Sequence, residues 1–292
     1  MGKLTETARR WLRPQVPRPN DARPWQVLAL SLLLSAGVFV LGFDLRPWHP
    51  PAVLTAALAA QWIGSRWIAR IPFDPLSATI TALSLSLLLR TDALWLSALA
   101  GALAVGSKFL IRVDGRHLFN PANLALVALP ALFAGAWISP GQWGSAGLWA
   151  VLIAAAGAMV AGRAARLDTT LAFLTAWAAL TFARALWLGD PMAIPLHQLQ
   201  SGALLVFAFF MISDPATTPQ KRPARLIHAV AVAGLGFALQ TLWLSNAGAI
   251  LALVVLAPLV PALNRLIPII QPKQEGNACP APSPPALSPA RP

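Results

Sequence analysis

Apolar runs of roughly 18 or more residues recur along this chain, and short loops rich in arginine separate them. A run of that length can cross the ~30 Å hydrocarbon core of a bilayer as a helix. The bilayer offers no water to backbone N–H and C=O groups, so a lipid-facing segment must satisfy them internally, as a helix does. The runs therefore predict an all-α, polytopic membrane protein. The composition agrees, because only 11% of the residues are charged, against about a quarter in soluble domains.

We expect about ten transmembrane helices, with boundaries good to a few residues. The expected spans are roughly 25–44, 50–69, 73–90, 92–112, 119–135, 146–163, 168–187, 196–213, 225–243 and 247–264. They form a transmembrane domain over residues 25–265, with halves at about 25–135 and 146–265. The flanking segments are a basic, Pro-rich cytoplasmic tail at 1–24 and a Pro-rich cytoplasmic tail at 266–292. We expect the second tail to be disordered, because it cannot form a packed core.

Positive charge is distributed unevenly over the loops. Loops on one side of the predicted membrane carry 19 of the 22 Lys and Arg residues, and the other side carries Arg46, Arg90 and Arg184. Cytoplasmic loops are enriched in Lys and Arg, so this asymmetry predicts a multi-pass protein of the plasma membrane, the inner membrane of a bacterium, with both termini cytoplasmic. Nucleic acid is not an expected partner, because no RNP-type, zinc-finger or helix-turn-helix pattern accompanies the net charge of +12.

Ten spans divide into two sets of five, and an odd set places the second half upside down relative to the first. In such an inverted repeat the third span corresponds to the eighth. Asp74-Pro75 opens the third span and Asp214-Pro215 closes the eighth, so both fall on the predicted cytoplasmic side. We therefore expect two inverted five-helix repeats.

Asn120, Pro121 and Asn123 stand at the start of the fifth span. A residue before proline favours an extended backbone, and proline suits the first position of a helix. The exposed N–H groups of that helix start, with Arg116 and Lys108 near in sequence, would suit a flavin phosphate or an anionic substrate. On residue types alone, an ordinary Asn cap is the favoured interpretation.

The eighth span ends in a polar elbow, Ser213–Pro219. Its candidate ligand residues are Asp214, Thr217 and Thr218. Asp214 is placed to accept backbone N–H bonds or to pair with Arg222 or Arg225, and the threonines to satisfy carbonyls left open at the helix end. The elbow either holds the polar edge of an isoalloxazine ring or a substrate, or only stops the helix; the residues leave both open.

Ser77 and Thr79 belong to a hydroxyl-rich strip at the start of the third span. Small hydroxyl residues usually serve close helix packing, and that interpretation is favoured here. The alternative is hydrogen bonding to a ligand between the two halves.

Charged groups avoid the middle of the predicted spans. The acidic residues all fall at span ends or in tails, which argues against a pump that uses buried carboxylates. Lys108 and Arg184 lie about one turn inside their spans and are expected to snorkel outward. The four histidines fall on separate segments, so no metal or haem site is predicted. Cys279 is the only cysteine, which excludes a disulfide within the chain.

Three segments resemble motifs of the RnfD/NqrB family: Arg116–Ala122 is similar to its FNPA element, Phe210–Pro219 to its late Ser-Asp-Pro element, and Pro75–Leu83 to its third-span pattern. Their order and spacing agree, so the resemblance covers roughly residues 25–265. The family consists of membrane subunits of the Rnf and sodium-pumping quinone reductase complexes. The resemblance implies flavin-linked electron transfer, a urea-transporter-like fold, and redox partner subunits in the membrane or cytoplasm.

One departure from the family pattern concerns its covalent flavin. Redox members carry a threonine esterified to FMN in the outer region between the halves, and the corresponding stretch here, Ala136–Ala146, has no threonine. Covalent FMN is therefore not expected. The chain is more similar to a short RnfD-like branch, which includes the UnbU-type proteins associated with enediyne biosynthesis.

The resemblance thus predicts a non-catalytic subunit of an oxidoreductase or electron transport complex, which binds FMN, riboflavin or quinone non-covalently. No catalytic or metal-binding residue is predicted. The candidate cofactor-binding residues are Asn120, Pro121, Asn123, Asp214, Thr217, Thr218, Ser77 and Thr79. Two alternatives stay open: a solute channel or transporter with a urea-transporter-like fold and no redox role, and a scaffold that recruits a partner through its basic face.

Overall fold

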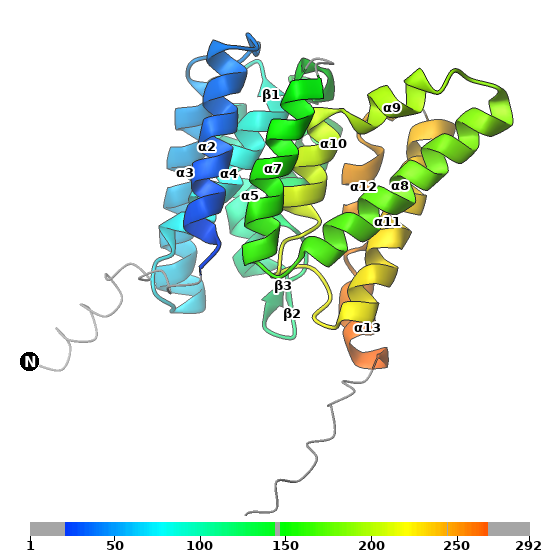
Figure 1. Ribbon diagram of the computed structural model, residues 1–292. Helices are drawn as coiled ribbons and strands as arrows, with labels where there is room; N and C mark the ends of the chain where they lie inside the picture. Colours follow the sequence, from blue (N-terminus) through cyan, green and yellow to red (C-terminus); the bar gives the residue numbers. More distant parts are fainter. Residues whose placement is uncertain (1–20, 144–146, 244, 268–292) are drawn as a thin grey trace, which may run out of the picture.

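The computed structural model describes residues 21–143, 147–243 and 245–267. Over these residues the chain is mostly helical, and most helices run roughly along one common direction, with α8 tilted away from the others (Figure 1). Most of the two predicted tails lies outside the described residues.

Ten predicted spans correspond to single helices or to consecutive helical segments. The first half contains α2 (Arg23–Phe39), α3 (His49–Ile63), the π-helix η1 (Gly64–Ala69), α4 (Pro75–Leu88), α5 (Leu94–Leu110) and α6 (Pro121–Leu132). The second half contains α7 (Gly147–Arg163), α8 (Leu167–Leu188), α9 (Ala193–Leu199), α10 (Gly202–Val206), the π-helix η3 (Phe207–Met211), α11 (Arg222–Leu242), α12 (Gly248–Leu256) and α13 (Leu259–Leu266). The remaining elements are β1 (Leu89–Thr91), β2 (Arg112–Val113), β3 (Arg116–His117), β4 (Ala136–Ile138) and the 3₁₀-helix η2 (Pro140–Trp143).

Helix length separates these elements into two groups. Two helices, α8 and α11, are long and apolar enough to cross a membrane alone. The number rises to four if the bent pairs, α9 with α10–η3 and α12 with α13, each form one span; they bend by 46° and 56°. The apolar helices α2, α4, α5, α6 and α7 have 10–17 residues, or ~15–26 Å at ~1.5 Å per residue. Ten complete crossings therefore stay a prediction.

The third and fifth predicted spans end earlier than expected: strand β1 takes the last residues of the third, and a turn that leads into β4 takes those of the fifth. The helices stop at Leu88 and Leu132 rather than at residues 90 and 135. Strand β1, which follows α4, pairs antiparallel with β4, which follows α6. This pairing satisfies backbone groups that would otherwise be left open at two helix ends.

A buried arginine supports the end of α4. Arg90 is 4% exposed, and its guanidinium donates to the carbonyl oxygens of Ser86 at 2.9 Å and Leu89 at 2.7 Å. It also donates to the side chain of Gln142 in η2. A cation at a helix C-terminus complements the helix dipole, so Arg90 links this helix end to the strand pair and η2.

Three helix contacts of the first half recur in the second. In the first half α3 packs on α5, α2 on α4, and α5 on α6. In the second half α8 packs on α11, α7 on α10 and η3, and α11 on α12. The halves meet where α2 contacts α7 and α6 contacts α12. With the spans numbered from one to five in each half, each contact named for the first half has its counterpart in the second.

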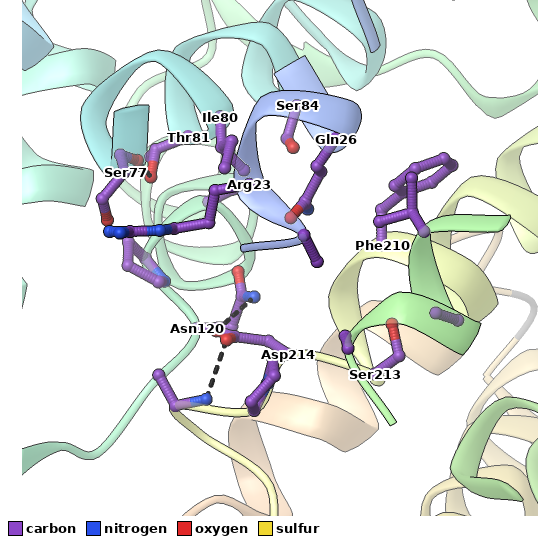
Figure 2. A pocket seen from close by; sticks show the side chains of 18 of the residues that line it. Arg23, Gln26, Ser77, Ile80, Thr81, Ser84, Asn120, Phe210, Ser213 and Asp214 are labelled. Atoms are coloured by element: carbon purple, nitrogen blue, oxygen red, sulfur yellow. Dashed lines mark hydrogen bonds between the residues drawn. The ribbon is translucent and has the colours of Figure 1, made fainter. Parts of the chain in front are cut away.

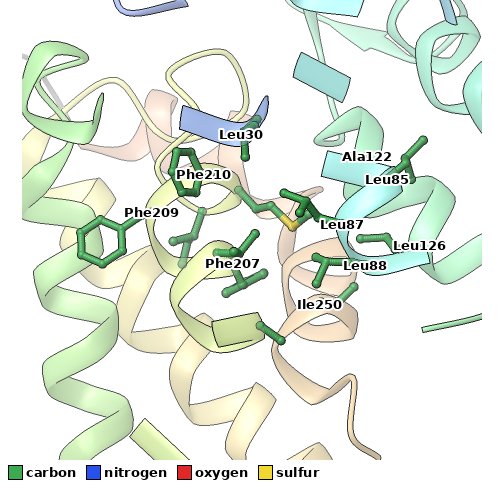
Figure 3. Packing of buried hydrophobic residues seen from close by; sticks show 14 of the residues in the cluster. Leu30, Leu85, Leu87, Leu88, Ala122, Leu126, Phe207, Phe209, Phe210 and Ile250 are labelled. Atoms are coloured by element: carbon green, nitrogen blue, oxygen red, sulfur yellow. The ribbon is translucent and has the colours of Figure 1, made fainter. Parts of the chain in front are cut away.

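The apolar core lies where the halves meet. Leucines of α4 and α6 gather beside Phe207 of η3 and Ile250 of α12 (Figure 3). Close approach of helices depends on glycine at two places: a Cβ on Gly101 would collide with the Val53 carbonyl oxygen, and one on Gly248 with the Gly236 carbonyl oxygen. Small residues at such crossings let helices associate inside a membrane.

Candidate functional site

Two helix starts at one end of the molecule are capped in the same way. Asp74 Oδ1 accepts a hydrogen bond from Ser77 N at 3.3 Å at the start of α4. Asn120 Oδ1 accepts one from Asn123 N at 3.1 Å at the start of α6. Each cap precedes a proline at the first helical position, as expected for Asx-Pro at a helix start. The predicted Asn cap is confirmed.

Asp214 organises the elbow at the end of the eighth span. Its carboxylate accepts from Ala216 N at 2.9 Å and from Thr217 Oγ1 at 3.2 Å. Thr218 Oγ1 donates to the Asp214 carbonyl oxygen at 2.8 Å. Arg116 of β3 holds the elbow from outside, because it donates to the Pro215 carbonyl oxygen at 2.6 Å. Thr218 thus satisfies a carbonyl as predicted, whereas Thr217 bonds to the carboxylate.

The predicted pairing of Asp214 with Arg222 or Arg225 is wrong. Both arginines approach Asp168 at the start of α8 instead, at 3.5 Å and 2.6 Å. Arg225 is largely buried, and its hydrogen bond to Asp168 ties the starts of α8 and α11 together. Within the described part of the chain, Asp214 forms no ion pair with Lys or Arg.

The two motifs meet in space although 94 residues separate them in sequence. Asn120 Nδ2 donates to Asp214 Oδ2 at 3.3 Å and to the Met211 carbonyl oxygen at 3.5 Å (Figure 2). The amide that caps α6 therefore also binds the elbow of the other half.

These groups border a cavity of about 980 Å³, which we call the first cavity. The starts of α2, α4 and α6 line it together with the end of α7, the end of η3 and the elbow. Figure 2 shows Arg23 and Ser77 on one side, Asn120 and Asp214 on another, and Phe210 across from them. Polar and ionic groups thus face an aromatic wall, which includes Phe209 and Phe210.

Four of the eight candidate residues line this cavity, and four do not. Those that line it are Ser77, Asn120, Pro121 and Asp214. The others bond elsewhere: Thr217 and Thr218 within the elbow, Thr79 Oγ1 to the Pro75 carbonyl oxygen at 2.9 Å, and Asn123 Nδ2 to the Ile250 carbonyl oxygen at 2.8 Å.

The sequence did not predict several of the residues that line the cavity. The predicted N-terminal tail includes Arg23, but Arg23 is the first residue of α2. Its guanidinium lies 2.5 Å from Asp74 Oδ2. Gln26 and Arg163 also line the cavity. The only sequence hint was the pair Asp21 and Arg23 directly before the first apolar run.

Lys108 points inward rather than snorkelling outward as predicted. It is 8% exposed, and its Nζ donates to Gln61 Oε1 and Ser77 Oγ, both at 2.8 Å. Those two acceptors take the place of water around the ammonium group. A positive charge therefore lies directly behind Ser77 in the cavity wall. Arg184 is half-exposed, and its Nη1 lies 3.6 Å from Asp190 Oδ2.

His117, at the end of β3, also lines the cavity. Burial lowers the pKa of its imidazole, and the nearby Asp214 carboxylate acts in the opposite direction. The lowered pKa favours the neutral imidazole at pH 7, because the unperturbed value is already ~6.5.

These features define the class of protein: a helical membrane protein with a polar cavity where its two halves meet. The chain belongs to the NQR2, RnfD, RnfE family, whose model matches residues 128–274. The match includes the elbow and Asp214, and it begins after Asn120. No curated protein matches the chain. Membership is consistent with a membrane subunit of a multisubunit electron-transport complex. The similarity to UnbU-type proteins stays a prediction.

Proposed function

We propose that this protein is a non-catalytic membrane subunit in flavin- or quinone-linked electron transfer, and that it binds FMN, riboflavin or quinone non-covalently in the first cavity. The observation that supports this most directly is the bond between the two family-like motifs, Asn120 to Asp214 at 3.3 Å, at the edge of an amphipathic cavity.

The groups that line the cavity suit a planar ring with polar edges. Phe209 and Phe210 offer an apolar wall, and aromatic faces pack well on flat rings. Gln26, Ser77 and Asn120 offer amide and hydroxyl groups for the ring edge. Arg23 and Arg163 are near enough to receive a phosphate, if the ligand is FMN. A bound flavin or quinone would supply the electron-carrying chemistry, and the chain's own residues would hold and orient it.

No covalent flavin forms part of this proposal. The outer stretch 136–146 has no threonine. Thr79 cannot take its place, because it belongs to α4 at the opposite end of the molecule, and its hydroxyl bonds to Pro75.

We further propose ten crossings in two inverted repeats, with both termini in the cytoplasm. The matched helix contacts of the two halves support the repeat. Apart from Arg46, Arg90 and Arg184, the described Lys and Arg residues lie at the end where α2, α4 and α6 begin (Figure 1). The positive-inside rule assigns that end, and the first cavity with it, to the cytoplasm of a bacterial cell. Redox partner subunits would then reach the cavity from the cytoplasm or within the membrane.

The test is extraction of small molecules from the purified full-length protein, followed by mass spectrometry and absorption spectroscopy. We expect about one flavin or quinone per chain, and no mass added to the polypeptide.

Asn120→Leu should lower ligand affinity by about tenfold, which corresponds to ~1.4 kcal/mol, the scale of one lost hydrogen bond. Asn264→Leu is the matched control, because Asn264 lies on α13 and lines no part of this cavity. Recovery of neither ligand, with no redox partner co-purifying, would reject the proposal.

A further inference from the structure

A second cavity, of about 540 Å³, lies at the opposite end of the molecule from the first. It is lined by α8, the segment from α9 to η3, α11, α12 and the start of η2. Its polar groups are mainly carboxamides, from Gln198, Gln240 and Asn246, beside the rings of Trp177 and Phe207. Asp, Glu, Lys and Arg do not occur among its lining residues. This chemistry favours neutral ligands that exchange hydrogen bonds with amides.

One helical segment lines both cavities. Phe207, at the start of η3, lines the second cavity, whereas Phe209 and Phe210 line the first. At ~1.5 Å rise per residue, these positions are only ~3–5 Å apart along the helix axis. Phe207 and Met211, at the two ends of this single turn, are each 1% exposed, so packed side chains fill the space around the turn. Short π-helical segments occur frequently at functional sites.

A buried amide oxygen without a hydrogen-bond partner lies where the two halves meet, on Asn123 of α6. Asn123 is 1% exposed, and its Nδ2 donates to the carbonyl oxygen of Ile250, which lines the second cavity. Its chain neighbours Pro121 and Ala122 line the first cavity. Among the described residues, Asn123 Oδ1 has no hydrogen-bond donor. A buried acceptor without a partner is uncommon and costs free energy, which suggests that something else bonds to it.

We propose that the two cavities are the two ends of one passage through the protein, closed in this structure at Phe207 and Met211, and that it admits small neutral solutes with N–H donors, such as simple amides. Asn123 Oδ1 is the acceptor that such a solute meets midway. The apolar turn excludes ions, because a charge would lose its hydration there without compensation. This passage does not depend on the electron-transfer proposal, since it requires no bound flavin or quinone and rests on the two cavities, η3 and Asn123. A flavin or quinone in the first cavity would block that end, so the flux is measured on protein free of both.

The experiment measures solute flux into proteoliposomes that contain the full-length protein, by stopped-flow light scattering with urea, acetamide and sodium chloride. We expect urea and acetamide to enter faster than into protein-free vesicles, and sodium chloride to enter no faster. Phe207→Ala should raise the amide flux severalfold by opening the barrier. Asn123→Leu should lower it severalfold, because the midway acceptor is lost.

The matched control is Phe109→Ala, which truncates another buried phenylalanine that lines neither cavity. Its amide flux should equal that of the unmodified protein. If Phe207→Ala does not fold, Phe207→Val retains more of the packing and should still raise the flux.

Flux equal to that of protein-free vesicles in both the unmodified protein and the folded Phe207 variant would overturn the passage. Equal entry of sodium chloride would overturn the assignment to neutral solutes. Neither result bears on flavin or quinone extraction, so the two proposals fail separately.

Discussion

At the scale of single residues, Asn120 uses both ends of one amide. Its Oδ1 caps α6 by accepting from Asn123 N at 3.1 Å, and its Nδ2 donates to Asp214 Oδ2 at 3.3 Å in the other half. The cap belongs to local secondary structure, whereas the second bond belongs to tertiary structure. Substitutions can separate these two contributions.

Asn120→Ala removes both bonds and should destabilise the protein by about 1–2 kcal/mol, the usual cost of a lost N-cap plus a modest hydrogen bond. Asn120→Ser retains a capping oxygen and loses only the amide N–H groups, so it should cost less than half as much. Thermal unfolding of both variants in detergent gives the comparison. Equal loss of stability in the two variants would show that the cap contributes little.

The same residues show how far sequence reasoning reaches. Asn120-Pro121 predicted a cap correctly, because capping depends on neighbours three residues away. For Asp214 the sequence leaves two possibilities open, bonds to backbone N–H groups or a pair with an arginine close in sequence; the first is found and the second is not. The arginines bind Asp168 instead, a residue more than 50 positions earlier. The pattern along one segment does not contain such distant partners.

At the scale of elements, the end of α4 depends on a buried cation. Arg90→Met removes the donors that reach the carbonyl oxygens of Ser86 and Leu89 and the Gln142 side chain. Buried acceptors left without partners cost about 1–3 kcal/mol each, so we expect a loss of ~2–4 kcal/mol. The measurement is the midpoint of thermal unfolding. Arg46→Met is the matched control: Arg46 is exposed at the same end of the molecule, so it should change stability by no more than ~0.5 kcal/mol.

Hydropathy located the helical segments but not their ends. Leu87–Leu89 continue an apolar run, so hydropathy favours a helix to about residue 90. The partner strand β4 lies more than 40 residues later, and short apolar runs look alike in helices and strands. Hydropathy does not show the broken spans either, because the bends of 46° and 56° fall inside single apolar runs. Pro258, at the second break, is a local signal for it. The four lining residues identified in advance all lie at caps or turns, where local rules apply.

At the scale of the whole molecule, the ten crossings and the orientation that we propose would place both termini and the first cavity in the cytoplasm. Cys279, the only cysteine, should therefore react with a membrane-impermeant maleimide in inverted vesicles and not in intact cells. In a Cys279→Ser background, Arg46→Cys should react in intact cells. Arg112→Cys, exposed at the opposite end, should react only in inverted vesicles.

Labelling of both engineered cysteines from the same side would contradict a protein that spans the bilayer between these two ends. Reversed labelling would place the first cavity outside the cell, out of reach of any cytoplasmic electron donor.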